Sequence, residues 1–212
     1  MISLNNYITE KLKINKSKLS SGPECTLFPE SKFELADMVN KEIEQNGNKC
    51  SLNHIDTNKI TDMSFLFSRA AKFGLSNFNG DISNWDVSNV TDMKCMFSHS
   101  DFNGNISDWD VSNVKDMESM FDGSNFNGDL SKWDVSKVKD MSHMFERSDF
   151  NNDSICNWDI SNVVNMMSMF RISPFNHDIS NWQVNPKCRI SAIFIGCAIR
   201  RDFEPKCLQK IE

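Results

Sequence analysis

The sequence predicts an α/β repeat fold, a solenoid of short parallel strands and short helical turns with a capping helix at its N-terminal end. A recurring stretch and its period predict this class. The stretch FNGDISNWDVSNVTDMKCMF, residues 78–97, returns with changes from Phe102, Phe126, Phe150 and Phe175. The tryptophans step by 24 or 25 residues and are Trp85, Trp109, Trp133, Trp158 and Trp182. A constant period in this range is typical of stacked repeats.

The first half of each repeat reads as a strand that turns a corner. Side chains alternate between the two faces of a strand. Phe78 and Ile82 have even numbers, whereas Trp85 and Val87 have odd numbers, so one straight strand cannot bury all four. A bend at residues 83–84 would bring both pairs into the interior. We therefore expect a strand at about residues 80–85, followed by a bend.

The second half of each repeat has the spacing of a short helix. Its apolar residues recur at i, i+3, i+6 and i+7 and are Val90, Met93, Met96 and Phe97. Ser88 or Asn89 could cap this helix. One repeat is too short to bury a core alone, so neighbouring coils must stack.

Polar residues also recur in columns. They are Asn79, Asn103, Asn127, Asn151 and Asn176; Ser88, Ser112, Ser136 and Ser161; and Asp86, Asp110, Asp134 and Asp159. We interpret them mainly as a structural ladder, because these side chains readily bond backbone at bends. A shared ligand surface remains the alternative.

The sequence divides the chain into four regions, and the first two precede the repeats. Residues 1–22 form a lysine-rich head, either a disordered tail or an amphipathic docking peptide, whose deletion should leave thermal stability almost unchanged. Residues 23–48 hold the capping helix, with a capping-box spacing at Ser31 and Glu34 and a stop at Gly47.

The solenoid itself is expected at residues 49–197, in about six coils. Residues 52–67 are its degenerate first unit, and residues 70–75 are an insertion that could form a contact site. Residues 198–212 read as a C-terminal cap or tail.

Composition narrows the possible partners and compartments. The net charge of −6 argues against a nucleic-acid partner. The seven cysteines form no CxxC pair, which favours free thiols over zinc or disulfides. No apolar run reaches membrane-spanning length, and the start lacks a signal-peptide core, so we expect no membrane span and a cytoplasmic location.

Catalytic and metal-binding patterns are absent from the sequence. No GxSxG, HExxH, P-loop or GxGxxG motif occurs. The histidines His54, His99, His143 and His177 occupy non-equivalent repeat positions, so we expect stacking not to gather them. The aspartates lack the order of a calcium loop. We therefore expect no cofactor, no metal and no enzymatic activity.

Specific recognition by stacked repeats needs outward side chains, and those that differ between coils add specificity. The expected strands should present a polar, acidic face, and some other outward positions vary in charge. The candidate partner-binding residues are Asp81, Ser83, Asn105, Ser107, Asp129, Ser131, Asp153, Asp178, Ser180, Lys94, Glu118 and Lys132. Such a surface favours a basic or hydrogen-bonding partner.

The unit WDVSNVxDMxxMF, followed by SxFNGDIS, closely resembles the BspA-type leucine-rich repeat found in mycoplasma surface lipoproteins and in proteins of gut bacteria and their phages. The resemblance covers about residues 50–197. It implies a leucine-rich-repeat-like solenoid that binds other molecules and carries no catalytic activity. The absence of an export signal and the lysine-rich head depart from the surface members of that family.

Together these observations predict a non-enzymatic protein-binding module, monomeric in solution. The alternative is a structural component of a virion or surface assembly, in which the ends of the solenoid would associate with other copies. The sequence leaves the identity of the partner open.

Overall fold

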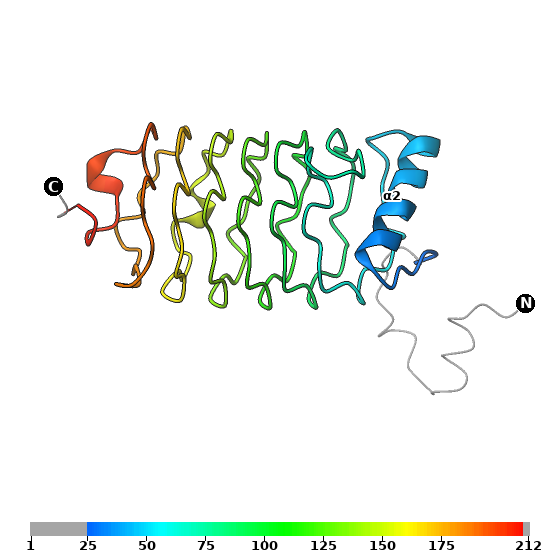
Figure 1. Ribbon diagram of the computed structural model, residues 1–212, viewed down its shortest axis with the longest axis horizontal. Coiled ribbons are helices and arrows are strands. Elements are labelled where there is room, and N and C mark those ends of the chain that lie inside the picture. The colour runs from blue at the N-terminus through cyan, green and yellow to red at the C-terminus, as the bar shows by residue number, and fades with distance from the viewer. Residues whose placement is uncertain (1–24, 210–212) are drawn as a thin grey trace, which may run out of the picture.

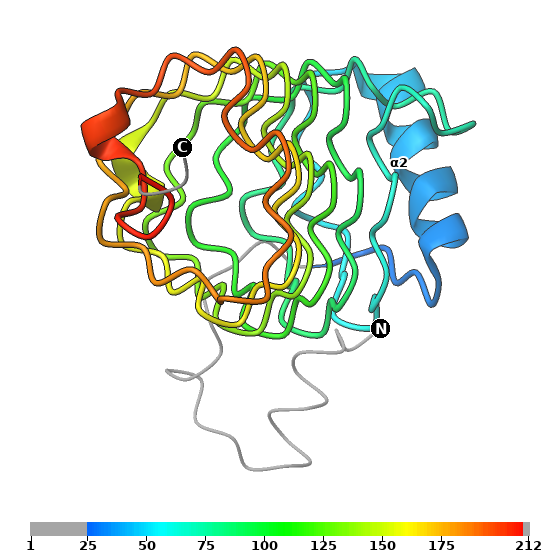
Figure 2. The same cartoon turned by 60° about the vertical axis from the view of Figure 1, so that its left-hand side comes forward.

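The computed structural model describes residues 25–209; the predicted basic head at residues 1–22 lies outside them. Figure 1 shows the repeats as coils lying side by side along the long axis of the molecule. Helix α2 lies against the first coil, and residues 198–209 lie at the opposite end. Figure 2 shows that each coil closes around a common interior.

The predicted α/β class is wrong. Residues 25–209 contain one α-helix, α2 (Lys32–Asn46), and the 3-10 helices η2 (Asp153–Ile155) and η3 (Arg201–Phe203). They contain no β-strand. Neighbouring segments share only isolated parallel bridges, at Leu27–Ile55, Ser51–Asp81, Asp62–Asp92, Asp92–Asp116, Asp116–Asp140, Asp140–Asn165 and Asn165–Arg189. The leucine-rich-repeat-like pattern of parallel strands and helical turns is therefore absent from this part of the chain.

Consecutive reverse turns replace the expected helix in each repeat. We call these stretches the ladder segments; they are residues 62–69, 92–99, 116–123, 140–147, 165–172 and 189–196. Alternate N–H groups donate to the next coil, as Met93 and Cys95 do to the carbonyls of Asp116 and Glu118 at 2.9 and 2.8 Å. Helical i to i−4 bonds cannot form when these donors are already engaged.

Left-handed residues recur within the ladder segments. Cys95 has a φ of 53° and His99 a φ of 52°. Their counterparts in other coils are Phe65, Ser119, His143, Ser168 and Ala192, and Gly123, Arg147, Ile172 and Gly196. A positive φ at every fourth residue interrupts a right-handed helix. The stripe of apolar residues gives no sign of this backbone conformation.

The expected strand at residues 80–85 is reduced to a single bridge. The N–H of Asp81 donates to the Cys50 carbonyl at 3.1 Å and its carbonyl accepts from the N–H of Leu52 at 2.8 Å, but side chains accept from other N–H groups in this part of the repeats. The N–H of Asn103 donates to Oδ1 of Asn79 at 2.9 Å, and the N–H of Ser83 donates to Oδ1 of Asp81 at 3.0 Å. Gly80 lies so close to the preceding coil that a Cβ there would be 2.0 Å from the Cys50 carbonyl oxygen. The bend at residues 83–84 does form, as a turn closed by Trp85 N–H to Ile82 O.

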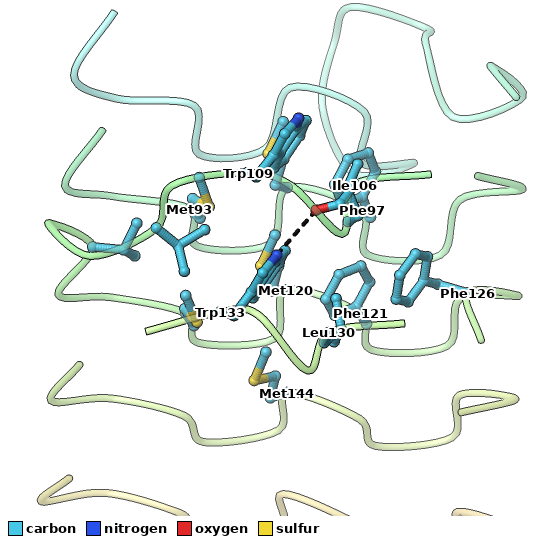
Figure 3. Packing of buried hydrophobic residues seen from close by; sticks show 14 of the residues in the cluster. Met93, Phe97, Ile106, Trp109, Met120, Phe121, Phe126, Leu130, Trp133 and Met144 are labelled. Atoms are coloured by element: carbon cyan, nitrogen blue, oxygen red, sulfur yellow. Dashed lines mark hydrogen bonds between the residues drawn. The ribbon is translucent and has the colours of Figure 1, made fainter. Parts of the chain in front are cut away.

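The predicted interior residues are buried in all the full repeats before the last coil. All five tryptophans are at most 5% exposed. Each indole N–H donates to a carbonyl of the preceding coil, such as Trp133 to Ile106 at 3.0 Å (Figure 3). Phenylalanine rings stack from coil to coil, with centroids of Phe97 and Phe121 5.6 Å apart. The interior is thus a continuous column of aromatic and thioether groups.

The N-terminal end is covered by the helix that the sequence predicts. Ser31 caps α2 by accepting from the N–H of Glu34 at 3.3 Å, and Gly47 ends it with a φ of 84°. Leu35 and Val39 are buried in the core. The insertion at residues 70–75 lies against this helix, where Phe73 meets the ring of Phe33 edge-on at 6.2 Å.

Candidate binding surfaces

The predicted acidic row is exposed and locally ordered. Asp81, Asn105, Asp129 and Asp178 are exposed, and Oδ1 of each accepts from the serine N–H two residues on at 2.8–3.0 Å. The N–H of Ser131 lowers the pKa of Asp129, and the N–H of Ser180 lowers that of Asp178. These carboxylates therefore stay charged at neutral pH.

The fourth full repeat departs from the row because it has one extra residue. There Asn152, rather than Asp153, accepts from the N–H of Ser154 at 2.9 Å and begins η2. Asp153 remains exposed. The register of the row is thus shifted at this coil, which the steps between tryptophans already indicated.

A second acidic column has the same construction. Its members are Asp86, Asp110, Asp134 and Asp159, and each accepts from the serine N–H two residues on at 3.0–3.1 Å. Hydrogen bonds from Ser112, Ser136 and Ser161 lower the pKa values of Asp110, Asp134 and Asp159. The column therefore adds exposed negative charge to every full coil before the last.

The asparagine column joins the coils to one another. Oδ1 of Asn79, Asn103, Asn127 and Asn151 each accepts from the N–H of the next asparagine in the column at 2.8–3.1 Å. The structural interpretation of the columns is confirmed for these bonds. A role in ligand binding for the acidic columns is a separate matter, because their carboxylates remain at the surface.

The three charged candidates outside the row form ion pairs across coils. Lys94 Nζ lies 2.6 Å from Glu118 Oε2, and Lys132 Nζ lies 2.6 Å from Asp108 Oδ1. These contacts raise the pKa values of both lysines. Because each pair is internally neutralised, these residues contribute less to the surface charge than the aspartate row does.

Sequence reasoning missed a charge network, which we call the Glu146 network. Glu146 is 4% exposed, and its carboxylate meets Arg171 at 2.7 Å and His143 at 2.5 Å. Arg147 lies 3.5 Å from Glu146 and 3.3 Å from Asp122. Asp122 also lies 3.7 Å from His99.

The network links two of the four histidines through intervening charged side chains. His99 and His143 occupy different repeat positions, yet Asp122, Arg147 and Glu146 connect them. Burial alone would raise the pKa of Glu146, but the bonds from His143 and Arg171 outweigh burial and lower it. Aligning the repeats would have shown that these positions are neighbours in the ladder segments.

Burial disfavours the thiolate form of two cysteines. It raises the pKa values of Cys95 and Cys156 to about 11. Both therefore stay protonated at neutral pH. All seven cysteines are free.

Within residues 25–209, no three side chains of the kinds that bind metals lie together, and no helix has the length and apolarity to cross a bilayer.

Comparison with known proteins identifies a family. A family model described as "Mycoplasma protein of unknown function, DUF285" matches residues 33–151 and again residues 122–203. The two matches overlap and together span most of the chain, as expected for a repeat family. No curated protein and no solved structure matches the chain.

Proposed function

This chain belongs to the DUF285 family of Mycoplasma proteins of unknown function, and we propose that it is a non-enzymatic protein-binding module that recognises a basic partner. The recognition surface is the acidic row at Asp81, Asn105, Asp129 and Asp178, together with the aspartate column beside it in the sequence. One observation carries the proposal: in every full coil, the row, the column or both supply an exposed aspartate.

Local order in the row favours binding. Each side chain is held by the serine N–H two residues on, so little side-chain freedom is lost when a partner binds. Neighbouring coils are joined at hydrogen-bond distance, so the aspartates of the column lie on consecutive coils, whereas the row is interrupted by the neutral Asn105 and by the shifted register at Asp153. Lysine and arginine side chains of an extended partner match such a series of carboxylates, and the attraction would weaken with salt.

The experiment uses a triple variant, Asp81→Asn, Asp129→Asn and Asp178→Asn. Asparagine keeps the Oδ1 acceptor, as Asn105 shows at the same repeat position with a bond of 3.0 Å to the N–H of Ser107. The variant therefore removes charge without removing the turn, but at Asp81 it also removes the acceptor that Oδ2 offers to Nδ2 of Asn53 at 2.6 Å. We expect a loss of stability no larger than about 1–2 kcal/mol from that one bond, and a fall in the capture of partner from a lysate of the source cells.

A matched control removes equal charge elsewhere. Asp37, Asp101 and Asp149 are exposed and lie outside the two columns, and their change to asparagine should leave capture intact. Reversal of charge at Asp81, Asp129 and Asp178 should weaken binding further, and more than it weakens folding. Equal loss of capture in the control variant would mean that net charge alone drives binding, which contradicts recognition by the row.

The structural-component alternative requires both ends of the stack to be open. Helix α2 covers the first coil, with Lys32 bonded to Asp62 and Ser64 at 2.7 Å. This argues against head-to-tail association of copies, and we therefore favour the binding module.

A further inference from the structure

The ladder segments have one direction throughout the stack. In every segment before the last, N–H groups of alternate residues donate to the next coil at 2.7–3.1 Å. Phe97 donates to Met120, for example, and Phe121 donates to Met144. Only the first residue of a segment, which makes the bridge, donates its N–H to the preceding coil, as Arg189 does to Val164. No later N–H in a segment does so. After its first residue, each ladder segment thus presents only main-chain donors toward the C-terminal end and only main-chain acceptors toward the N-terminal end.

Within residues 25–209, the donors of the last ladder segment have no acceptor. The N–H groups of Ile190, Ala192, Phe194 and Gly196 correspond to those that donate in every earlier coil, and none finds an acceptor among residues 25–209. The carbonyls between them are engaged, since Ile193 O and Ile195 O accept from the preceding coil. The edge is therefore a row of donors without acceptors, a backbone arrangement suited to bind electron-rich groups.

Apolar groups beside this edge are incompletely covered. Ile190 and Phe194 are half-buried, whereas their counterparts Met166 and Phe170 are fully buried. Ile195 is 60% exposed and Ile172 is 49% exposed. Exposed isoleucines beside unpaired backbone groups are typical of an interaction surface rather than of a finished end.

Two basic side chains lie at the start of the same segment. The aspartates that bridge the earlier coils give way to Asn165 and then to Arg189. Lys187 and Arg189 are both exposed, and no ion pair involves either within the described residues. The start of the last ladder segment therefore combines positive charge with main-chain donors, in contrast to the acidic row and column.

We propose that this edge binds a segment of a partner protein that presents main-chain carbonyls at every second residue, flanked by acidic side chains. The repeat's own ladder sequence has this chemistry. Residues 113–124, NVKDMESMFDGS, offer the carbonyls of Asp116, Glu118, Met120 and Asp122 to the preceding coil. The partner is accordingly a chain with an uncapped coil of the same repeat type. The surface is distinct from the acidic row.

A folded second copy of this chain does not supply such a segment. Its matching carbonyls would be those of Asp62, Ser64 and Leu66, which accept no backbone bond within residues 25–209. Helix α2 lies over that coil, however (Figure 1). The donor edge of one copy therefore cannot reach the acceptor edge of another.

The test uses the full chain and a labelled synthetic peptide of residues 113–124, followed by fluorescence anisotropy. We expect saturable binding, and binding about tenfold weaker for Arg189→Glu, which places a negative charge beside the acidic peptide. Lys115→Glu reverses an exposed charge on an inner coil and should leave the affinity within about twofold. A scrambled peptide of the same composition should not bind.

Hydrogen exchange adds a readout at the edge itself. In the free protein, the amides of Ile190, Ala192, Phe194 and Gly196 should exchange far faster than those of Met166, Ser168, Phe170 and Ile172, and the peptide should slow the first group only. Equal binding of the scrambled peptide, or no binding at all, would overturn the proposal. Protection of the edge amides in a dimer found by light scattering would also overturn it, by making a second copy the occupant.

Discussion

At one repeat position, an inner coil buries a glutamate while the last coil exposes an isoleucine. Glu146 is 4% exposed, and Ile195, two coils later at the equivalent position, is 60% exposed. The carboxylate is covered because His143 and the next coil's Arg171 bond to it. Among the described residues, no further coil covers Ile195. Burial here is therefore decided by the neighbouring coil and not by the hydrophobicity of the side chain.

Truncation of the same side chain in two consecutive coils gives the largest test of this comparison. Phe170 is fully buried, and Phe194 at the equivalent position is half-buried. We expect Phe170→Ala to lower the free energy of unfolding by about 3–5 kcal/mol. Phe194→Ala should cost roughly half as much, because part of its ring is already in solvent. Urea denaturation measures both, and equal costs would contradict an incompletely covered last coil.

The buried glutamate should be the next most sensitive site. Glu146→Ala removes the carboxylate between Arg171, Arg147 and His143, and we expect a loss of about 1–3 kcal/mol, moderated by the partial exposure of both arginines. Ile195→Ala should cost under about 1 kcal/mol. Thermal unfolding of the two variants compares them, and a larger loss for Ile195→Ala would reverse the comparison.

The same carboxylate should produce a pH dependence. The pKa of Glu146 is lowered in the folded protein, so its stabilisation is present above the unfolded pKa of about 4.3 and is lost as pH falls through the folded value. Wild-type protein and Glu146→Ala should therefore converge in stability as the solution is made more acidic. A difference that stays constant down to pH 3 would assign the loss to packing and not to charge.

The asparagine column should show a smaller effect. Asn127→Ala removes the acceptor for the N–H of Asn151, bonded at 2.8 Å, and we expect a loss of about 0.5–1.5 kcal/mol. Asn127→Asp keeps an oxygen at that place and serves as the control. Denaturation at neutral pH distinguishes them, and an equal loss in both variants would mean that the acceptor does not stabilise the stack.

The smallest expected effect is a gain. Burial and the charges of Asp92 and Asp140 raise the pKa of Asp116, so its ionised form destabilises the fold at neutral pH. Asp116→Asn should add about 0.5 kcal/mol at pH 7, following Asn165, which donates to Asp140 at 2.9 Å. The gain should shrink as pH falls and Asp116 becomes protonated. A loss of stability in this variant would show that the like charges of the bridging column do not repel one another measurably.

Much of the interior could be predicted from the sequence. Phe78, Ile82, Trp85 and Val87 are buried, as their parity and the bend at residues 83–84 required. The helix from Ser31 to Gly47 followed from its cap residues. These features depend on local chemistry or on a period, and both are visible in one dimension.

The backbone conformation of the repeats could not be predicted in this way. The stripe of Val90, Met93, Met96 and Phe97 fits a helix, but left-handed Cys95 and donors directed to the next coil produce turns instead. The choice depends on which acceptors the next coil supplies. Of the candidate binding residues, Asp81, Asn105, Asp129 and Asp178 proved exposed and ordered, whereas Lys94, Glu118 and Lys132 are neutralised in pairs.

The sequence by itself determined the period, the residues of the interior, the capping helix and the excess of acidic side chains, because each is a property of residue type and spacing. Only the tertiary structure decided the direction of the main-chain donors, the burial of Glu146 and the open edge at the last coil. Those features arise between coils, where a backbone group or side chain takes its environment from residues about 24 positions away.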